Sequence, residues 1–218
     1  MGKDFEINEK IKVYIEDFSK QLHLVQKEII AYNENLGDIK KMQISVSQCH
    51  FLELITKVSK AKKILEIGTF TGLSALSMSL GLPDNGSLIA LDKNAVTSKI
   101  ASNFFKKAKQ DKKIKTIIKP ALETLKDLKK DNITFDIAFI DADKNNYQNY
   151  YDEVMDLVKK DSLIIIDNVL WHGEVADENN NDKFTNIIRD FNKHVKNDKK
   201  TDQVIIPLGD GFTVCRKL

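Results

Sequence analysis

The residues with the clearest chemical potential are acidic, and they follow short apolar runs. Asp141 follows the run 135–140, and Asp167 and Asn168 follow the run 163–166. Two carboxylates and an amide supply oxygen ligands, which suit Mg²⁺, with Mn²⁺ or Ca²⁺ as alternatives. No Cys or His stands beside them, which argues against Zn²⁺. An isolated Asp-x-Asp is usually a helix cap or a solvated turn, so the metal site requires that the two runs be neighbouring strands.

Lys144 lies three residues beyond Asp141. In a closed pocket near a divalent cation, desolvation and positive charge both favour the neutral amine. A neutral amine can act as general base on a hydroxyl, so Lys144 is the candidate catalytic base, with Asp141 beside it. The alternative is an ordinary surface lysine.

A glycine turn follows an earlier apolar run. The segment from Glu66 to Ser74 reads E-x-G-x-x-x-G, with Gly68 and Gly72 flanking Thr69. A dinucleotide site would instead carry G-x-G-x-x-G for its pyrophosphate. A carboxylate beside a tight turn suits a cationic nucleoside without phosphates, which points to S-adenosylmethionine. The alternative is a turn that only reverses the chain.

Asp92 ends the next apolar run, 88–91. A carboxylate at this distance after a glycine turn is placed to accept hydrogen bonds from both ribose hydroxyls. Its alternative role is the N-cap of the following helix. The two features together favour the nucleoside site over either alternative.

These residues require a scaffold that brings strand ends together. Apolar runs, predicted to be strands, occur at 64–67, 88–91, 116–118, 135–140, 163–166, 203–207 and 211–215, and amphipathic helices are predicted at 71–81, 94–109, 121–130, 146–159 and 183–196. Continuous apolar strands alternating with helices indicate an α/β fold with a doubly wound, mostly parallel sheet. The last two runs, joined by a short turn, indicate a C-terminal antiparallel hairpin. Two further helices are expected at 9–33 and 47–59, the second capped by Ser45 or Ser47.

Composition limits the classes of function. The 218 residues suggest a single domain, 1–218, with an N-terminal helical extension at 1–60 and an α/β core at 61–218. The net charge of +2 and only two arginines, Arg189 and Arg216, argue against a nucleic-acid partner. The sequence shows no signal peptide and no apolar run of membrane-spanning length, so we expect a cytoplasmic protein with no membrane partner.

Several motifs together resemble one family. They are Leu65 to Gly72, Asp141-Ala142-Asp143-Lys144 with Tyr147 and Tyr150, Asp167 to Trp171, Leu208 to Gly211, and Met42 to Ser45. In order and spacing they look like the metal-dependent O-methyltransferases of the caffeoyl-CoA and catechol type. The resemblance implies a Rossmann-like class I methyltransferase fold with a seven-stranded sheet and S-adenosylmethionine as donor.

The resemblance also implies residue roles. Lys144 would be the base, with Asp141, Asp167 and Asn168 holding the metal. The donor would contact Ile44, Glu66, Gly68, Thr69, Ser74, Asp92, Ala121, Asp143 and Tyr150. The acceptor would be a catechol-like small molecule or another vicinal diol, in a homodimeric enzyme whose N-terminal helix helps to shape the acceptor pocket.

The chain departs from the family pattern at three positions. Asp161-Ser162 replaces a Gly-Gly turn, Cys49 stands where glycine is typical, and His172 stands where a smaller or amide residue is common. Two other functions stay open. The lysine runs, including 112–115, leave an RNA methyltransferase as an alternative, and a catalytically silent S-adenosylmethionine-binding protein of the same fold is the other.

Overall fold

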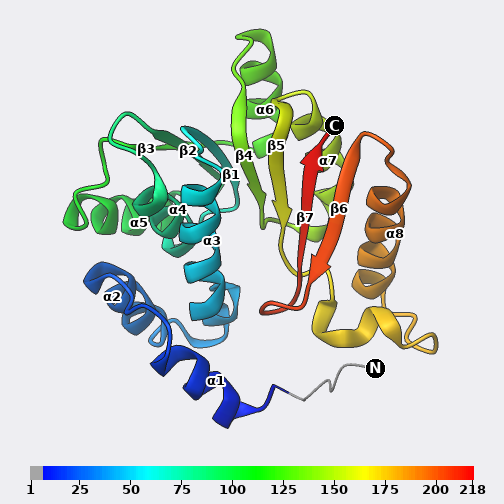
Figure 1. Cartoon of the computed structure of the whole chain (residues 1–218), viewed down its shortest axis with the longest axis horizontal. Coiled ribbons are helices and arrows are strands. Elements are labelled where there is room, and N and C mark those ends of the chain that lie inside the picture. Colours follow the sequence, from blue (N-terminus) through cyan, green and yellow to red (C-terminus); the bar gives the residue numbers. More distant parts are fainter. Residues whose placement is uncertain (1–6) are drawn as a thin grey trace.

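Seven strands form one sheet in the order β3-β2-β1-β4-β5-β7-β6, in a computed structural model that describes residues 7–218 (Figure 1). The strands are β1 Lys63–Ile67, β2 Ser87–Asp92, β3 Ile114–Ile118, β4 Phe135–Ile140, β5 Val158–Ile166, β6 Thr201–Ile206 and β7 Phe212–Lys217. The first five pair in parallel, and β7 is antiparallel to both β5 and β6. This confirms the predicted mostly parallel sheet with a C-terminal antiparallel hairpin.

Helices cover both faces of the sheet, because alternate side chains of each strand point to opposite faces. One core packs α2 Leu24–Asn33, α3 Val46–Val58, α4 Leu73–Gly81 and α5 Ala95–Lys107 against strand residues such as Ile64. The other packs α6 Ala121–Lys130, α7 Tyr147–Met155 and α8 Lys183–Asn197 against residues such as Leu65. Each core contains one fully buried cysteine, Cys49 in the first and Cys215 in the second.

The predicted single helix 9–33 is wrong, because the chain forms two helices there. Helix α1, Glu9–Asp17, has no buried residue, whereas α2 buries Val25 and Ile29. A capping box starts α2: the His23 side chain accepts from the Val25 backbone N–H at 3.2 Å, and Gln26 accepts from the His23 backbone N–H at 2.9 Å. A cap of this kind satisfies N–H groups that a continuous helix would bond internally, so it favours a new start.

The fifth strand is longer than predicted. It begins at Val158 instead of 163, and α7 correspondingly ends at Met155. Asp161, which stands in place of the resembling family's Gly-Gly turn, has φ +67°, and the pairing with β4 shifts register between Phe135 and Ile137. The glycine-free sequence therefore adopts a left-handed residue within the strand, far from the carboxyl ends where the polar residues gather.

In the described part of the chain, 7–218, no helix is long and apolar enough to cross a membrane.

Candidate active site

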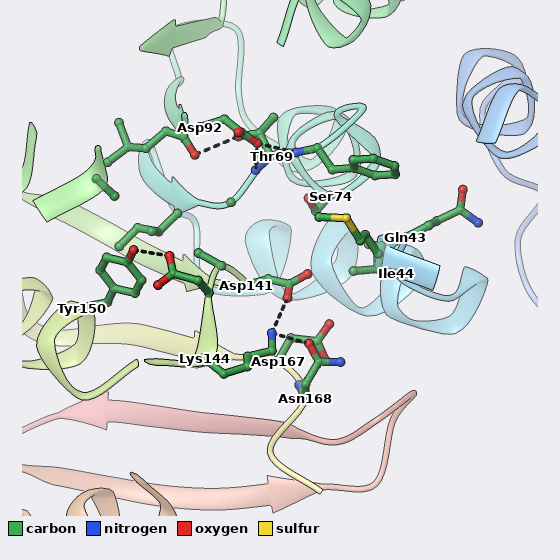
Figure 2. A pocket seen from close by; sticks show the side chains of 18 of the residues that line it. Gln43, Ile44, Thr69, Ser74, Asp92, Asp141, Lys144, Tyr150, Asp167 and Asn168 are labelled. Carbon is green, nitrogen blue, oxygen red and sulfur yellow. Dashed lines mark hydrogen bonds and ion pairs between the residues drawn. The ribbon is translucent and has the colours of Figure 1, made fainter. Parts of the chain in front are cut away.

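The carboxyl ends of β1, β2, β4 and β5 border a cavity of about 550 Å³ (Figure 2). Of the predicted site residues, those lining it are Ile44, Gly68, Thr69, Ser74, Asp92, Ala121, Asp141, Asp143, Lys144, Tyr150, Asp167 and Asn168. Glu66 alone is not part of the lining. The sheet order explains this convergence, because β1 lies between β2 and β4 and ligands of such sheets bind outside the carboxyl ends of the strands.

Gly68 allows the ends of β1 and β4 to approach each other. Its φ is +93°, and a Cβ added there would lie 2.0 Å from the backbone carbonyl oxygen of Asp141. A backbone atom of a central strand cannot move aside easily, so any other residue would push the Asp141 segment away. The glycine turn therefore fixes the position of the next predicted site residue, in addition to reversing the chain.

Glu66 lies behind the cavity wall, completely buried. Its carboxyl accepts hydrogen bonds from the Ser74 hydroxyl at 2.5 Å and the Thr69 hydroxyl at 2.8 Å. Burial raises the pKa of Glu66 to about 8, the charges of Asp141 and Asp92 add to the rise, and the two hydrogen bonds oppose it. Near neutral pH the Glu66 carboxyl is therefore largely protonated, and the negative charge at this end of the cavity comes from other residues.

Asp92 holds the glycine turn in place. Its Oδ2 accepts from the backbone N–H groups of Thr69 at 3.1 Å and Phe70 at 2.8 Å, and its Oδ1 accepts from the Asn94 backbone N–H at 2.8 Å (Figure 2). Asn94 is the N-cap residue of α5, with its side chain accepting from the first turn. The alternative reading of Asp92 as that N-cap is thus excluded, and its carboxylate remains part of the cavity lining.

Asp143 is held ionised at the same end. Burial alone would raise its pKa, but hydrogen bonds from the Tyr150 hydroxyl at 2.7 Å and the Asn146 amide at 2.6 Å, with Lys93 nearby, keep it below the ordinary value. Asn146 belongs to the short 3-10 helix Lys144–Asn146, which links β4 to α7. This carboxylate supplies a fixed negative charge to the cavity.

Lys144 lies between the predicted metal ligands (Figure 2). Its Nζ donates to Asp141 Oδ1 at 3.1 Å and to Asn168 Oδ1 at 2.7 Å, and it also contacts the Tyr147 hydroxyl. The buried Tyr147 hydroxyl in turn donates to the backbone carbonyl of Asp167 at 3.1 Å. The side chain is about 13% exposed, so the ordinary surface lysine considered above does not describe it.

The donor set suits a hard divalent cation. Among residues 7–218 no group of three or more His, Cys, Asp or Glu side chains could hold a metal ion. The predicted set differs from such a group because it has two carboxylates, and its third ligand is an amide. The Nζ atom of Lys144 lies where oxygens of Asp141 and Asn168 converge. All three predicted ligands supply oxygen, the donor type that Mg²⁺, Mn²⁺ and Ca²⁺ prefer.

Asp167 is the most buried of the three, at 3% exposure. Burial and the neighbouring Asp141 charge raise its pKa well above the ordinary value, and hydrogen bonds only partly oppose this. Its Oδ1 accepts from the Asn168 backbone N–H at 2.6 Å and from Gln48 Nε2 at 2.9 Å. Both donors stabilise the carboxylate form, which is the form a cation would bind.

Three residues of the site had no role assigned from sequence. They are Gln48, Tyr147 and Asp210, which accepts from Asn168 Nδ2 at 3.4 Å. Tyr147 and Asp210 lie in motifs that carry the family resemblance, although no role was assigned to them. Ser45 and Gln48 form the S-x-x-Q pattern of a capping box, which the structure shows at the start of α3. That pattern locates a helix start and says nothing about a partner 119 positions away.

Three further segments contribute lining residues to the cavity: the 3-10 helix after β5, the turn that holds Asp210, and residues 41–44. The short 3-10 helix Trp171–Ala176 begins with two left-handed residues, Trp171 at φ +46° and His172 at φ +56°. The His172 backbone N–H donates to Asp210 Oδ1 at 2.6 Å, and its ring is largely exposed. Within residues 7–60 only 41–44 line the cavity, and α1 contributes no lining residue.

The sheet order and the carboxylates at its strand ends define a Rossmann-like methyltransferase. The model of a family described as O-methyltransferase matches residues 15–218. The chain therefore belongs to the O-methyltransferase family, which confirms the class of enzyme expected from the sequence, an S-adenosylmethionine-dependent O-methyltransferase.

Curated relatives and solved structures agree with this. A probable caffeoyl-CoA O-methyltransferase 1 of Dictyostelium discoideum is 38% identical and covers 98% of this chain and 94% of its own length. A caffeoyl-CoA O-methyltransferase of Populus kitakamiensis is 35% identical over 86% of this chain and 83% of its own. An O-methyltransferase from Bacillus cereus, solved in complex with SAH, has a TM-score of 0.86 at 26% identity, covering 95% of this chain and 97% of that one.

Proposed function

We propose that this enzyme methylates one hydroxyl of a catechol-like or other vicinal diol, with S-adenosylmethionine as donor and a divalent cation, Mg²⁺ first, held by Asp141, Asp167 and Asn168. The observation that carries the proposal is the position of Lys144 Nζ, within 3.1 Å of Asp141 and 2.7 Å of Asn168, in the same cavity as Asp92. A base, a cation-binding oxygen set and a nucleoside-binding carboxylate would then share one cavity.

The donor occupies the end formed by the glycine turn and Asp143. Asp92, already fixed by three backbone N–H groups, accepts from the ribose hydroxyls. The ionised Asp143 places negative charge near the sulfonium, and Ile44 and Ala121 supply apolar wall. The glycine at position 68 lets the donor approach the backbone closely.

The acceptor hydroxyl lies at the Lys144 end. When bound, a divalent cation supplies charge that stabilises the deprotonated hydroxyl. The amine of Lys144 takes the hydroxyl proton, the oxygen forms a bond to the donor methyl carbon, and the carbon–sulfur bond breaks to leave a neutral thioether. Much of the rate enhancement comes from holding the oxygen and the methyl group in line.

A methyl-transfer assay tests the proposal. A panel of catechols is incubated with S-adenosylmethionine and the protein, with Mg²⁺ or with EDTA. We expect mono-methylated product only with the cation, and Asp141→Ala should lose activity in its presence. Full activity in EDTA, or undiminished activity of Asp141→Ala, would refute the metal role.

The resemblance also leads us to propose a homodimer with no nucleic-acid partner. Sedimentation equilibrium measures the first, with twice the 24.8 kDa chain mass as the expected result. Filter binding of RNA across a salt series measures the second. Phosphate contacts would produce RNA binding that falls steeply as the salt concentration rises. We expect no RNA binding at any salt concentration.

A further inference from the structure

Gln48 connects three parts of the molecule that the sequence keeps far apart. Its Oε1 accepts from the Ser45 backbone N–H at 2.8 Å, and its Nε2 donates to Asp167 Oδ1 at 2.9 Å. A Cβ added to Gly209, in the turn between β6 and β7, would lie 2.5 Å from the Gln48 amide. The side chain is 3% exposed, so water does not replace either hydrogen bond.

These contacts determine how Asp167 presents its carboxylate. The Gln48 amide and the Asn168 N–H both bind Oδ1, at 2.9 and 2.6 Å, and no protein hydrogen bond to Oδ2 occurs among the described residues. One oxygen is thus fixed by protein and the other is left for a ligand. An amide donor does this without adding charge, whereas a lysine would compete with a cation for the carboxylate.

We propose that Gln48 is a positioning residue that orients Asp167 for the cation, a role that rests on the proposed metal-dependent function. Through Ser45 the same side chain also fixes the start of α3, directly after Ile44 of the cavity wall. The cation ligand and the N-terminal wall of the cavity are therefore positioned by one buried amide.

Gln26 provides a matched control. It is also the third residue of a helix with a capping box, accepting from the His23 N–H at 2.9 Å, and it is 1% exposed. Its Nε2 donates at 2.8 Å to the Ser77 hydroxyl, within the core and away from the cavity lining. Gln26→Leu therefore removes the same kind of cap and buried hydrogen bond as Gln48→Leu, without touching Asp167.

The test measures binding of Mn²⁺ alone. Trp171 is the single tryptophan and lines the cavity, so its emission reports a paramagnetic ion bound nearby. We expect Gln48→Leu to raise the Mn²⁺ dissociation constant by about tenfold or more, the usual effect of removing a residue that orients a metal ligand. Gln26→Leu should leave the Mn²⁺ dissociation constant unchanged and should bind S-adenosylhomocysteine like the wild type.

A second variant applies if Gln48→Leu does not fold. Gly209→Ala, at φ +60°, pushes a methyl group onto the Gln48 amide, whereas Gly37→Ala has φ +62° and nothing within 4 Å. The two substitutions carry the same backbone strain, but only the first should weaken Mn²⁺ binding.

The outcomes separate the two proposals. Wild-type protein that binds S-adenosylhomocysteine but no Mn²⁺ would overturn the metal site, and the positioning role with it. Wild-type binding of Mn²⁺ with equal affinity in Gln48→Leu, or in Gly209→Ala where the first variant is unfolded, would overturn the positioning role alone. An equal loss in Gln26→Leu would do the same, since the effect would then follow from helix capping.

Discussion

Lys144 sits between a carboxylate and an amide, and its position makes its contribution to catalysis measurable. Lys144→Ala should lower kcat by about 10²- to 10⁴-fold, the range typical of a lost general base. Binding of S-adenosylhomocysteine should not change, because the donor end depends on Asp92 and Asp143. The measurement is methyl transfer to a catechol with Mg²⁺ present.

The control for this substitution is Lys159→Ala, since that side chain is half-exposed and pairs with Asp136 at 3.7 Å. It should retain wild-type kcat. If Lys144→Ala kept more than a tenth of the activity, the base would have to be another group.

The raised pKa of the buried Glu66 carboxyl makes the free energy of unfolding depend on pH. Burial raises its pKa from 4.5 to about 8, so between these values the folded chain keeps a proton that the unfolded chain releases. The free energy of unfolding should therefore fall as the pH rises through this window. Glu66→Gln has no proton to release, so it should lose less stability between pH 5 and pH 8.

Urea unfolding of both proteins at the two pH values checks this. A wild-type loss equal to that of Glu66→Gln would show that the carboxyl titrates alike in both states. The comparison removes the contribution of titrating groups that do not interact with Glu66, because only position 66 differs.

At the scale of elements, the glycine turn after β1 packs directly against the backbone at the end of β4, so neither can move without the other. Gly68→Ala would place a methyl group 2.0 Å from the Asp141 carbonyl oxygen at φ +93°. Strain and displacement together should cost about 3 kcal/mol of unfolding free energy or more. Gly173→Ala, at φ +83° with nothing within 4 Å, should cost only about 1 kcal/mol.

Denaturant titration of the two glycine variants gives the comparison. Similar losses in both would mean that backbone conformation, and not the close approach to Asp141, accounts for the glycine at position 68.

Elements were predictable from the sequence to the degree that a local pattern determined them. The apolar runs located every strand. The five parallel strands gave continuous runs because a parallel strand covered on both faces is apolar throughout, and the antiparallel pair β6 and β7 was located by two runs joined by a short turn. Helix α1 could not be separated from α2 by periodicity, because the His23–Gln26 capping box acts through hydrogen bonds that hydrophobic spacing does not record. The 3-10 helix starting at Trp171 was missed, since its left-handed residues are not glycine.

At the scale of the whole molecule, strand alternation predicted that separate strand ends would meet, and the sheet order brought Asp92, Asp141 and Asp167 to one cavity. What the sequence could not provide was the pairing of distant polar groups. Gln48 and Asp167 lie 119 positions apart, and Asn168 and Asp210 lie 42 apart. Such contacts depend on how α3 and the β6–β7 turn pack against the sheet, which no local spacing encodes.

The two cysteines lie in the cores on opposite faces of the sheet, so the rate at which each thiol is alkylated reports how often its own face opens. Burial raises the pKa of each thiol to about 12, so neither reacts with an alkylating reagent until its surroundings open. Cys49 is in α3, within the N-terminal extension, whereas Cys215 is in β7 between two strands. We expect iodoacetamide to label Cys49 faster, because helices can detach from a sheet more easily than an inner strand can leave it. Equal rates would instead show that both faces open together as one cooperative unit.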